Sequence, residues 1–234
     1  MKKTHLAMAA LIGLMAAMAG QARATTVSIN FSGPGVGGTL LLTYGTATDA
    51  KYANAFEATG ISGTFSDSNN GLNIVNAPVG PLVAITHSTP EPTNLLAPND
   101  FSRFAVASGL PAVNNGFLTY DNLFWPGGSP QTASDYPVSG GFLDIYGLMF
   151  NIGGGDVVDF WSNGISTGDT ADYGVAVATA ALSLDYVGGG VSASLPEPGS
   201  LSLFATGLIG LLSWRRRAAS AIPTAAYPTS RPGC

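Results

Sequence analysis

The chain contains very little cysteine, histidine and basic charge. Its 234 residues include one cysteine, Cys234, at the end of the chain, and two histidines. Between Thr25 and Leu195 there are thirteen acidic residues but only two basic ones, Lys51 and Arg103, which gives this segment a net charge of −11. The segment therefore has no disulfide framework, thiol nucleophile or cysteine metal site. It also lacks the basic surface that nucleic-acid binding needs.

Support for a catalytic motif is weak as well. His87 is the one histidine of this segment, in a proline-rich stretch, and no His-Glu-x-x-His motif occurs. The only glutamates of the segment are Glu57 and Glu91. We therefore predict a protein that is not an enzyme. The alternative is a glycan-active hydrolase, which needs two carboxylates across a cleft.

The N-terminus has the three parts of a secretory signal. Lys2 and Lys3 precede an apolar run from Leu6 to Ala19, and Ala22-Arg23-Ala24 forms a small-x-small cleavage site. This order predicts a signal peptide over residues 1–24, with Ala22 and Ala24 read by signal peptidase after passage through the Sec translocon. The mature chain then begins at Thr25.

The C-terminus carries a second three-part pattern. Pro196-Glu197-Pro198 precedes an uncharged run from Leu201 to Trp214, and Arg215, Arg216 and Arg217 follow. The run has 14 residues and as a helix would be only about 21 Å long. A comfortable membrane span needs roughly 20 residues. The arginines favour the cytoplasmic side, which places everything before Pro196 outside the membrane.

This pattern resembles the PEP-CTERM sorting signal of Gram-negative bacteria. There, a Pro-Glu-Pro motif, a short transmembrane helix and a basic cluster are recognised by an exosortase, a membrane-embedded cysteine transpeptidase. The resemblance implies a sorting signal over residues 196–217, a transient inner-membrane anchor, and release to the cell surface or the extracellular space. A tail over 218–234 departs from the usual pattern. The alternative is an uncut membrane-anchored surface protein.

Between the two signals the sequence is typical of β-structure, because short runs of β-branched, aromatic and leucine residues alternate with Gly, Pro, Asn and Asp. We predict an all-β ectodomain over residues 25–187, an antiparallel β-sandwich or jelly roll. Gly188-Gly189-Gly190 predicts a flexible linker over 188–195. Residues 49–59 fit either a helix or a strand. The expected strands are 27–31, 39–44, 61–65, 82–86, 117–120, 141–152, 157–161, 173–178 and 181–187.

Three strings, 60–69, 119–130 and 140–150, also resemble those of a recurring group of exported PEP-CTERM proteins. That group has no established activity, so this resemblance supplies no site residues.

Two ligand sites are worth testing. Tyr120, Asp121, Asn122 and Trp125 combine aromatic rings with polar groups, as sugar-binding sites do; the alternative is that the aromatics anchor a loop in the core. Asp156, Asp159, Asp169 and Asp172 lie in two glycine-rich stretches and could hold a structural calcium ion, although turn formation explains them without an ion.

The sequence thus predicts an exported cell-surface or extracellular-matrix protein with a structural, adhesive or glycan-binding role in an exopolysaccharide or biofilm matrix. Its expected partners are the exosortase, transiently the membrane, and exopolysaccharide, with no nucleic acid. No cofactor is expected besides that calcium ion.

Overall fold

The computed structural model describes residues 24–86, 95–106, 116–180 and 184–195. These residues form eleven strands and no α-helix. The strands are β1 Thr25–Ser32, β2 Val36–Thr48, β3 Phe56–Asp67, β4 Ile74–Leu82, β5 Ser102–Ala105, β6 Phe117–Tyr120, β7 Leu123–Phe124, β8 Leu148–Ile152, β9 Val157–Gly164, β10 Asp172–Ala178 and β11 Leu184–Ser194. Two 3₁₀ turns, η1 Asn69–Gly71 and η3 Gly153–Gly155, accompany them.

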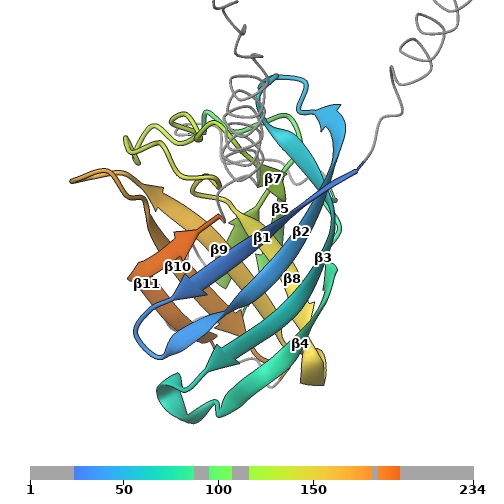
Figure 1. Cartoon of the computed structure of the whole chain (residues 1–234), viewed down its shortest axis with the longest axis vertical. Coiled ribbons are helices and arrows are strands. Elements are labelled where there is room, and N and C mark those ends of the chain that lie inside the picture. Colours follow the sequence, from blue (N-terminus) through green and yellow to red (C-terminus); the bar gives the residue numbers. More distant parts are fainter. Residues whose placement is uncertain (1–23, 87–94, 107–115, 181–183, 196–234) are drawn as a thin grey trace, which may run out of the picture. The chain divides into compact units, whose positions relative to one another are not determined.

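Eight of the strands form one sheet that closes on itself (Figure 1). The order is β2-β1-β11-β10-β9-β8-β4-β3, β3 pairs again with β2, and every pairing is antiparallel. The all-β antiparallel prediction is confirmed. The predicted sandwich or jelly roll is not what forms, since the sheet is a barrel in which strands pair with their successors along the chain. Closure pairs the edge strands that an open sheet would leave exposed.

Side chains fill the interior of the barrel. Alternate residues of each strand point inwards, such as Ile29 and Phe31 on β1, and both are almost fully buried. The ring of Phe31 lies 5.1 Å from that of Phe160, which lies 5.4 Å from that of Tyr173. A barrel of eight strands is just wide enough for such packing, so the interior is a solid core.

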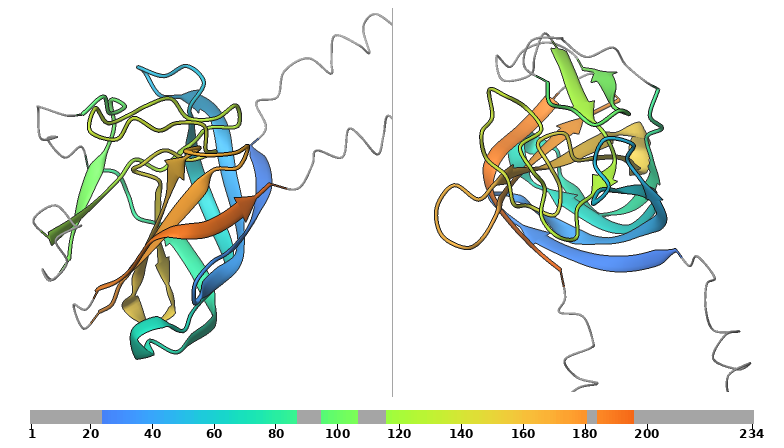
Figure 2. Two further views of the ribbon diagram at one scale, coloured as in Figure 1. Left: turned by 90° about the vertical axis from the view of Figure 1, so that its left-hand side faces the viewer. Right: turned by 90° about the horizontal axis from the view of Figure 1, so that it is seen from above.

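A long insertion, residues 83–147, separates β4 from β8. Its hairpin β5–β6 covers the outer face of β8, β9 and β10, where Leu118 and Tyr120 pack with Met149, Val157, Trp161 and Ala176. Figure 2 shows the rest of the insertion looping across one end of the barrel. Strands β8 to β10 are therefore buried on both faces, which explains their nearly continuous apolar sequences.

The predicted central strand over 141–152 is shorter than expected, because β8 begins only at Leu148. Gly147 interrupts it with a φ of 69°, and a Cβ there would lie 2.1 Å from the carbonyl oxygen of Phe160. Only glycine fits this close approach. The stretch 49–59, which fitted either a helix or a strand, forms a loop over residues 49–55, and β3 starts at Phe56. Of the expected strand 82–86, only Leu82 is in a strand, as the last residue of β4.

The predicted linker over 188–195 was wrong. These residues continue β11, which pairs with β10 on one side and with β1 on the other. Val191 is only 1% exposed, and Leu195 packs partly buried against the core. The three glycines lie where the pairing of β10 with β11 shifts register, and the paired residues on either side keep them within β11.

The barrel has two unlike ends. We call the end where β1 begins and towards which β11 runs the loop end; it also carries the loop 49–55, the insertion and the loop 165–171. The opposite end, the turn end, has the short connections 33–35, 68–73 and 153–156. Strand β11 ends part-way along β1, because Ser194 pairs with Asn30 and Leu195 therefore comes level with Ile29.

The pairing of β11 can be tested by truncation. A protein of residues 25–195 keeps the β1–β11 pairing, whereas one of residues 25–187 loses all three of its register pairs. We expect the first to unfold cooperatively on heating and the second to lose its cooperative transition, because an open barrel exposes two strand edges and part of the core. Thermal unfolding followed by circular dichroism measures this. Equal transitions for the two proteins would show that 188–195 is a linker after all.

Candidate functional site

Strands β3 and β4 separate towards the loop end. They pair from Asp67–Ile74 to Thr64–Pro78 and no further. Beyond that point β3 pairs with β2 and β7, while β4 turns to β8. Two prolines of β4, Pro78 and Pro81, have no N–H to donate to a ladder. The result is a wedge-shaped opening in the barrel wall.

Asn122 bridges this wedge. Its carbonyl oxygen accepts a hydrogen bond from the N–H of Ala58 at 2.9 Å, and its side-chain amide donates to the carbonyl oxygen of Val83 at 2.7 Å. Its side-chain oxygen accepts from the N–H of Met149 at 2.9 Å. A φ of 53° permits this arrangement, and asparagine tolerates that region better than most residues. Asn122 therefore completes the wall where the strands part.

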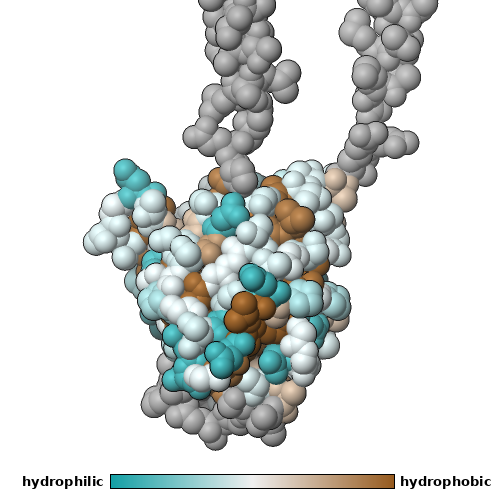
Figure 3. Space-filling model, turned by 60° about the horizontal axis from the view of Figure 1, so that its bottom comes forward, coloured by the Kyte–Doolittle hydropathy of each residue, from teal (hydrophilic) through white to brown (hydrophobic). Residues whose placement is uncertain are grey.

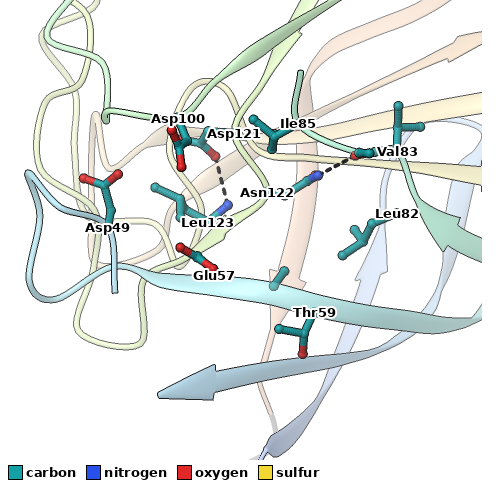
Figure 4. Close-up of a pocket in the computed structure, with 12 residues that line it drawn as sticks. Asp49, Glu57, Thr59, Leu82, Val83, Ile85, Asp100, Asp121, Asn122 and Leu123 are labelled. Atoms are coloured by element: carbon teal, nitrogen blue, oxygen red, sulfur yellow. Dashed lines mark hydrogen bonds between the residues drawn. The ribbon is translucent and has the colours of Figure 1, made fainter. Parts of the chain in front are cut away.

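Beside Asn122 the wedge opens into a pocket of about 260 Å³ (Figure 4). Its walls combine four carboxyl groups, the Thr59 hydroxyl and apolar side chains such as Leu82 and Ile85. The carboxyl groups belong to Asp49, Glu57, Asp100 and Asp121. The lining includes no lysine or arginine, so the pocket disfavours anions and suits ligands that are neutral or cationic and donate hydrogen bonds.

Two of these carboxylates serve the structure. Asp49 accepts hydrogen bonds from the N–H groups of Lys51, Tyr52 and Asn99, which ties the loop 49–55 to the insertion. Asp121 accepts from the N–H of Leu123 at 3.0 Å. Glu57, in contrast, is exposed at the start of β3. The pocket thus presents the exposed Glu57 beside buried groups such as Asp49 and Asp121.

Asp121 is the outermost of three buried carboxyl groups. Asp144 accepts hydrogen bonds from the N–H groups of Tyr146 and Gly147, and Asp159 lies on the covered face of β9. All three are at most 3% exposed. Burial raises the pKa of Asp121 and Asp159 well above the usual value, and that of Asp144 is raised by the same cause. The neighbouring Asp144 carboxyl raises the pKa of Asp121 further.

A second buried pair lies far from the pocket, at the turn end. Asp67 on β3 and Asp185 on β11 are 0% and 4% exposed, and the Asn70 side chain donates a hydrogen bond to Asp185. Burial raises the pKa of Asp67 to about 6, and the nearby Asp185 carboxyl raises it further than burial alone would. Neither pair was visible in the sequence, because the partners are far apart along the chain.

The predicted glycan-binding residues are divided by the structure. Tyr120 is 2% exposed and donates to the carbonyl oxygen of Ala84 at 2.8 Å, while Trp125 is fully buried with its ring 5.2 Å from that of Tyr52. Neither ring is available for stacking on a sugar. Both rings instead anchor the loop in the core, as in the alternative given above. Asp121 and Asn122 do line the pocket. Glu57, Thr59 and Asp100 join them, and only strand pairing could have revealed this grouping.

The four predicted calcium ligands are not brought together. Asp156 accepts from the N–H of Ala180 at 2.9 Å, and Asp172 accepts from the N–H of Gly190 at 2.7 Å. Asp159 is buried in the covered face, and Asp169 is exposed in a loop. In the part of the chain that the structure describes, no three His, Cys, Asp or Glu side chains are grouped to hold a metal ion.

The surface offers no large apolar area over the described residues. The exposed large hydrophobic residues are Leu41, Val75, Leu96, Phe117 and Ile165, on different elements. On the face in Figure 3, hydrophobic residues form small areas among hydrophilic ones. Single exposed hydrophobic residues are normal in soluble domains, so these residues need no functional explanation.

The comparison with protein families decides the character of the C-terminus. Residues 194–217 match the family model of the PEP-CTERM protein-sorting motif. This chain carries a PEP-CTERM sorting motif. Its Pro196-Glu197-Pro198, apolar run and Arg215 to Arg217 are the parts predicted above. The motif supports an exported protein that is anchored in the membrane, sorted by an exosortase and directed to the cell surface.

No similar protein was found among the curated proteins, and none among the solved structures. The described residues contain no helix that is long and apolar enough to cross a membrane. Several predicted features lie outside the described residues, namely residues 1–23 of the signal peptide, His87, Glu91, the apolar run 201–214, the arginines and the tail. Only Ser194 and Leu195 of the matched motif lie within them.

The buried carboxyl groups predict a domain that is stabilised by mild acid. A raised pKa means that the folded state binds the proton more tightly than the unfolded chain. For Asp67, with a pKa of about 6 against 3.8, the free energy of unfolding is highest below pH 4 and falls as the pH rises through 6. Asp121, Asp144 and Asp159 act in the same direction. We expect residues 25–195 to have a higher Tm at pH 5 than at pH 8.

Asp67→Asn isolates one of these groups, and Asp169→Asn removes one exposed negative charge as its control. We expect Asp67→Asn to raise the Tm at pH 8 by roughly 6–12 °C, since a shift of about two pKa units corresponds to roughly 3 kcal/mol and each kcal/mol moves the Tm by about 2–4 °C. The difference should vanish at pH 4. If both variants behave alike, general charge repulsion and not burial causes the pH dependence.

Proposed function

We propose that the barrel is the cargo of an exosortase pathway and acts at the cell surface or in the extracellular matrix as a non-enzymatic glycan-binding protein. The observation that carries this is the matched sorting motif, which begins at the last residue of β11. With a signal peptide over 1–24, the mature product would be the barrel almost alone. The fold thus coincides with the part that both targeting signals deliver.

The pocket supports the glycan part of this proposal. Its exposed acceptor, Glu57, lies in the same pocket as the apolar side chains of Leu82 and Ile85, and sugars need both hydrogen-bond acceptors for their hydroxyl groups and an apolar surface for their C–H faces. Its volume of about 260 Å³ suits one or two sugar units. The absence of basic residues from its lining favours neutral or amino sugars over uronic acids and sugar phosphates.

A glycan-active hydrolase is the second candidate. Glu57 and Asp121 line the same pocket, and Asp121 has a pKa raised by burial, as a general acid needs. Against this, Asp121 is engaged by the N–H of Leu123 and by Asp144. We therefore favour binding over hydrolysis.

Processing can be tested on the mature protein. We expect mass spectrometry to find a C-terminus that lacks Arg215 to Arg217 in cells with the exosortase, and the intact peptide in cells from which the exosortase has been deleted. The uncut anchor of the alternative reading predicts the intact peptide in both. Detection of Arg215 to Arg217 in the surface product of normal cells would therefore contradict the proposal.

Glycan binding can be tested with Glu57→Gln, which keeps the size of the side chain and removes its charge. We expect the wild-type barrel to bind the polysaccharide extracted from its own host, and Glu57→Gln to bind about tenfold more weakly, the effect of losing roughly 1.4 kcal/mol from a charged hydrogen bond. Asp169→Asn, in the loop 165–171, is the matched control and should bind normally.

The same incubation separates the two candidates. New reducing ends that appear with wild type and disappear with Glu57→Gln would establish hydrolysis. Binding without new reducing ends supports the proposal, and failure of the wild type to bind any extracted polysaccharide contradicts it.

A further inference from the structure

The last residue of β11 belongs both to the barrel and to the sorting motif. Ser194 is the first residue of the sorting motif and also the residue that pairs with Asn30 on β1. Leu195 follows it, packed against the barrel core, and the next residue is Pro196 of the Pro-Glu-Pro motif. No spare residue therefore separates the folded barrel from the motif that the exosortase reads.

This arrangement is a steric problem for the processing enzyme. Enzymes that cut or transfer a peptide usually bind it as an extended chain, with backbone hydrogen bonds to residues on both sides of the bond that reacts. Here the residues before Pro196 already give their backbone to β1 or their side chain to the core. On the other side, at no more than about 3.6 Å per residue, Leu201 lies within roughly 20 Å of Leu195.

The seam between β1 and β11 is suited to local opening. It has three register pairs, Asn30–Ser194, Phe31–Ala193 and Ser32–Ser192, whereas β1 and β2 share eight. Upstream lie the glycines 188–190, with a φ of 77° at Gly190 and a register shift between β10 and β11 in the same region. Val191, buried inside, holds β11 in place before the seam. The end after Val191 can therefore detach while the rest of the barrel stays folded.

We propose that the end of β11 gates sorting: the exosortase acts on this chain only after Ala193 to Leu195 have separated from β1. The inference rests on exosortase sorting, and it adds the partner's requirement for a released strand end. Release from the membrane would then depend on the local stability of the seam and not only on the presence of the motif.

A pair of cross-strand disulfides tests the gate. Opposite residues of antiparallel strands lie about 4.5–5.5 Å apart at Cα, within the range that a disulfide spans. Asn30→Cys with Ser194→Cys locks the end of the seam. Ser32→Cys with Ser192→Cys, the matched control, locks the seam two residues earlier and leaves Ala193 to Leu195 free. All four positions are exposed, and Cys234→Ser in every variant prevents mispairing.

We expect the Asn30–Ser194 disulfide to abolish removal of Arg215 to Arg217, measured by mass spectrometry of the C-terminus, and a reductant to restore it. The Ser32–Ser192 disulfide should leave processing at the wild-type rate. Six Gly and Ser residues inserted between Leu195 and Pro196 should restore processing of the locked variant without a reductant.

Thermal unfolding of each purified barrel shows whether the locked variants are folded. Processing of the oxidised Asn30–Ser194 variant at the wild-type rate would overturn the gate. If the wild-type chain itself is never processed, the sorting proposal fails and not the gate.

Discussion

The pairing of β1 with β11 is the interaction on which the rest of the molecule depends. It joins the first strand to the last, so it turns a row of antiparallel strands into a closed barrel. Without it, two strand edges would be open, and inward-facing residues such as Ile29 and Val191 would lose part of their cover. Closure is the most non-local contact of the fold, and loop entropy makes such contacts costly to form early. The barrel is therefore complete only when the chain has reached Ser194.

The second constraint is the strongly acidic composition. Six aspartates of the described residues are buried, namely Asp49, Asp67, Asp121, Asp144, Asp159 and Asp185. Their donors are mainly backbone N–H groups in turns, as at Asp49 and Asp144, and the side-chain amide of Asn70. Where such donors run out, carboxyl groups lie close to one another and their pKa values rise. Carboxyl groups that are buried without enough hydrogen-bond donors therefore bind protons more tightly in the folded state.

Much of the fold could be predicted from local patterns. Alternation and turn residues located most of the strands, since those signals are carried by neighbouring residues. The barrel could not be predicted, because closure depends on which distant edges meet. The linker prediction failed for the same reason: Gly188-Gly189-Gly190 is flexible by itself, and only its two neighbouring strands make it part of β11.

The candidate site shows the same limit. The string around Tyr120 and Trp125 combines aromatic rings with polar groups, but composition cannot distinguish a ring that stacks on a ligand from one that anchors a loop. Burial decides it for these two rings. Asp121 and Asn122 were picked out for sugar binding, whereas Glu57 and Thr59 became candidates only when β3 and β4 were seen to separate. The sorting signal was predictable because its three parts are contiguous.

The positions of the two signals constrain how this protein can be held at the surface. Thr25, the expected first residue, opens β1, and Leu195 ends the described barrel on the neighbouring strand, level with Ile29 of β1. After cutting near Pro-Glu-Pro, the mature chain would keep hardly any free tail at either terminus. Lasting attachment must then use either the new C-terminus, joined within a few residues of the loop end, or the barrel surface itself. In the first case the loop end, which carries the pocket, would face the attachment point at close range. In the second case, the pocket is free to bind the surface component that holds the protein. The site of processing therefore decides whether the pocket can serve for attachment.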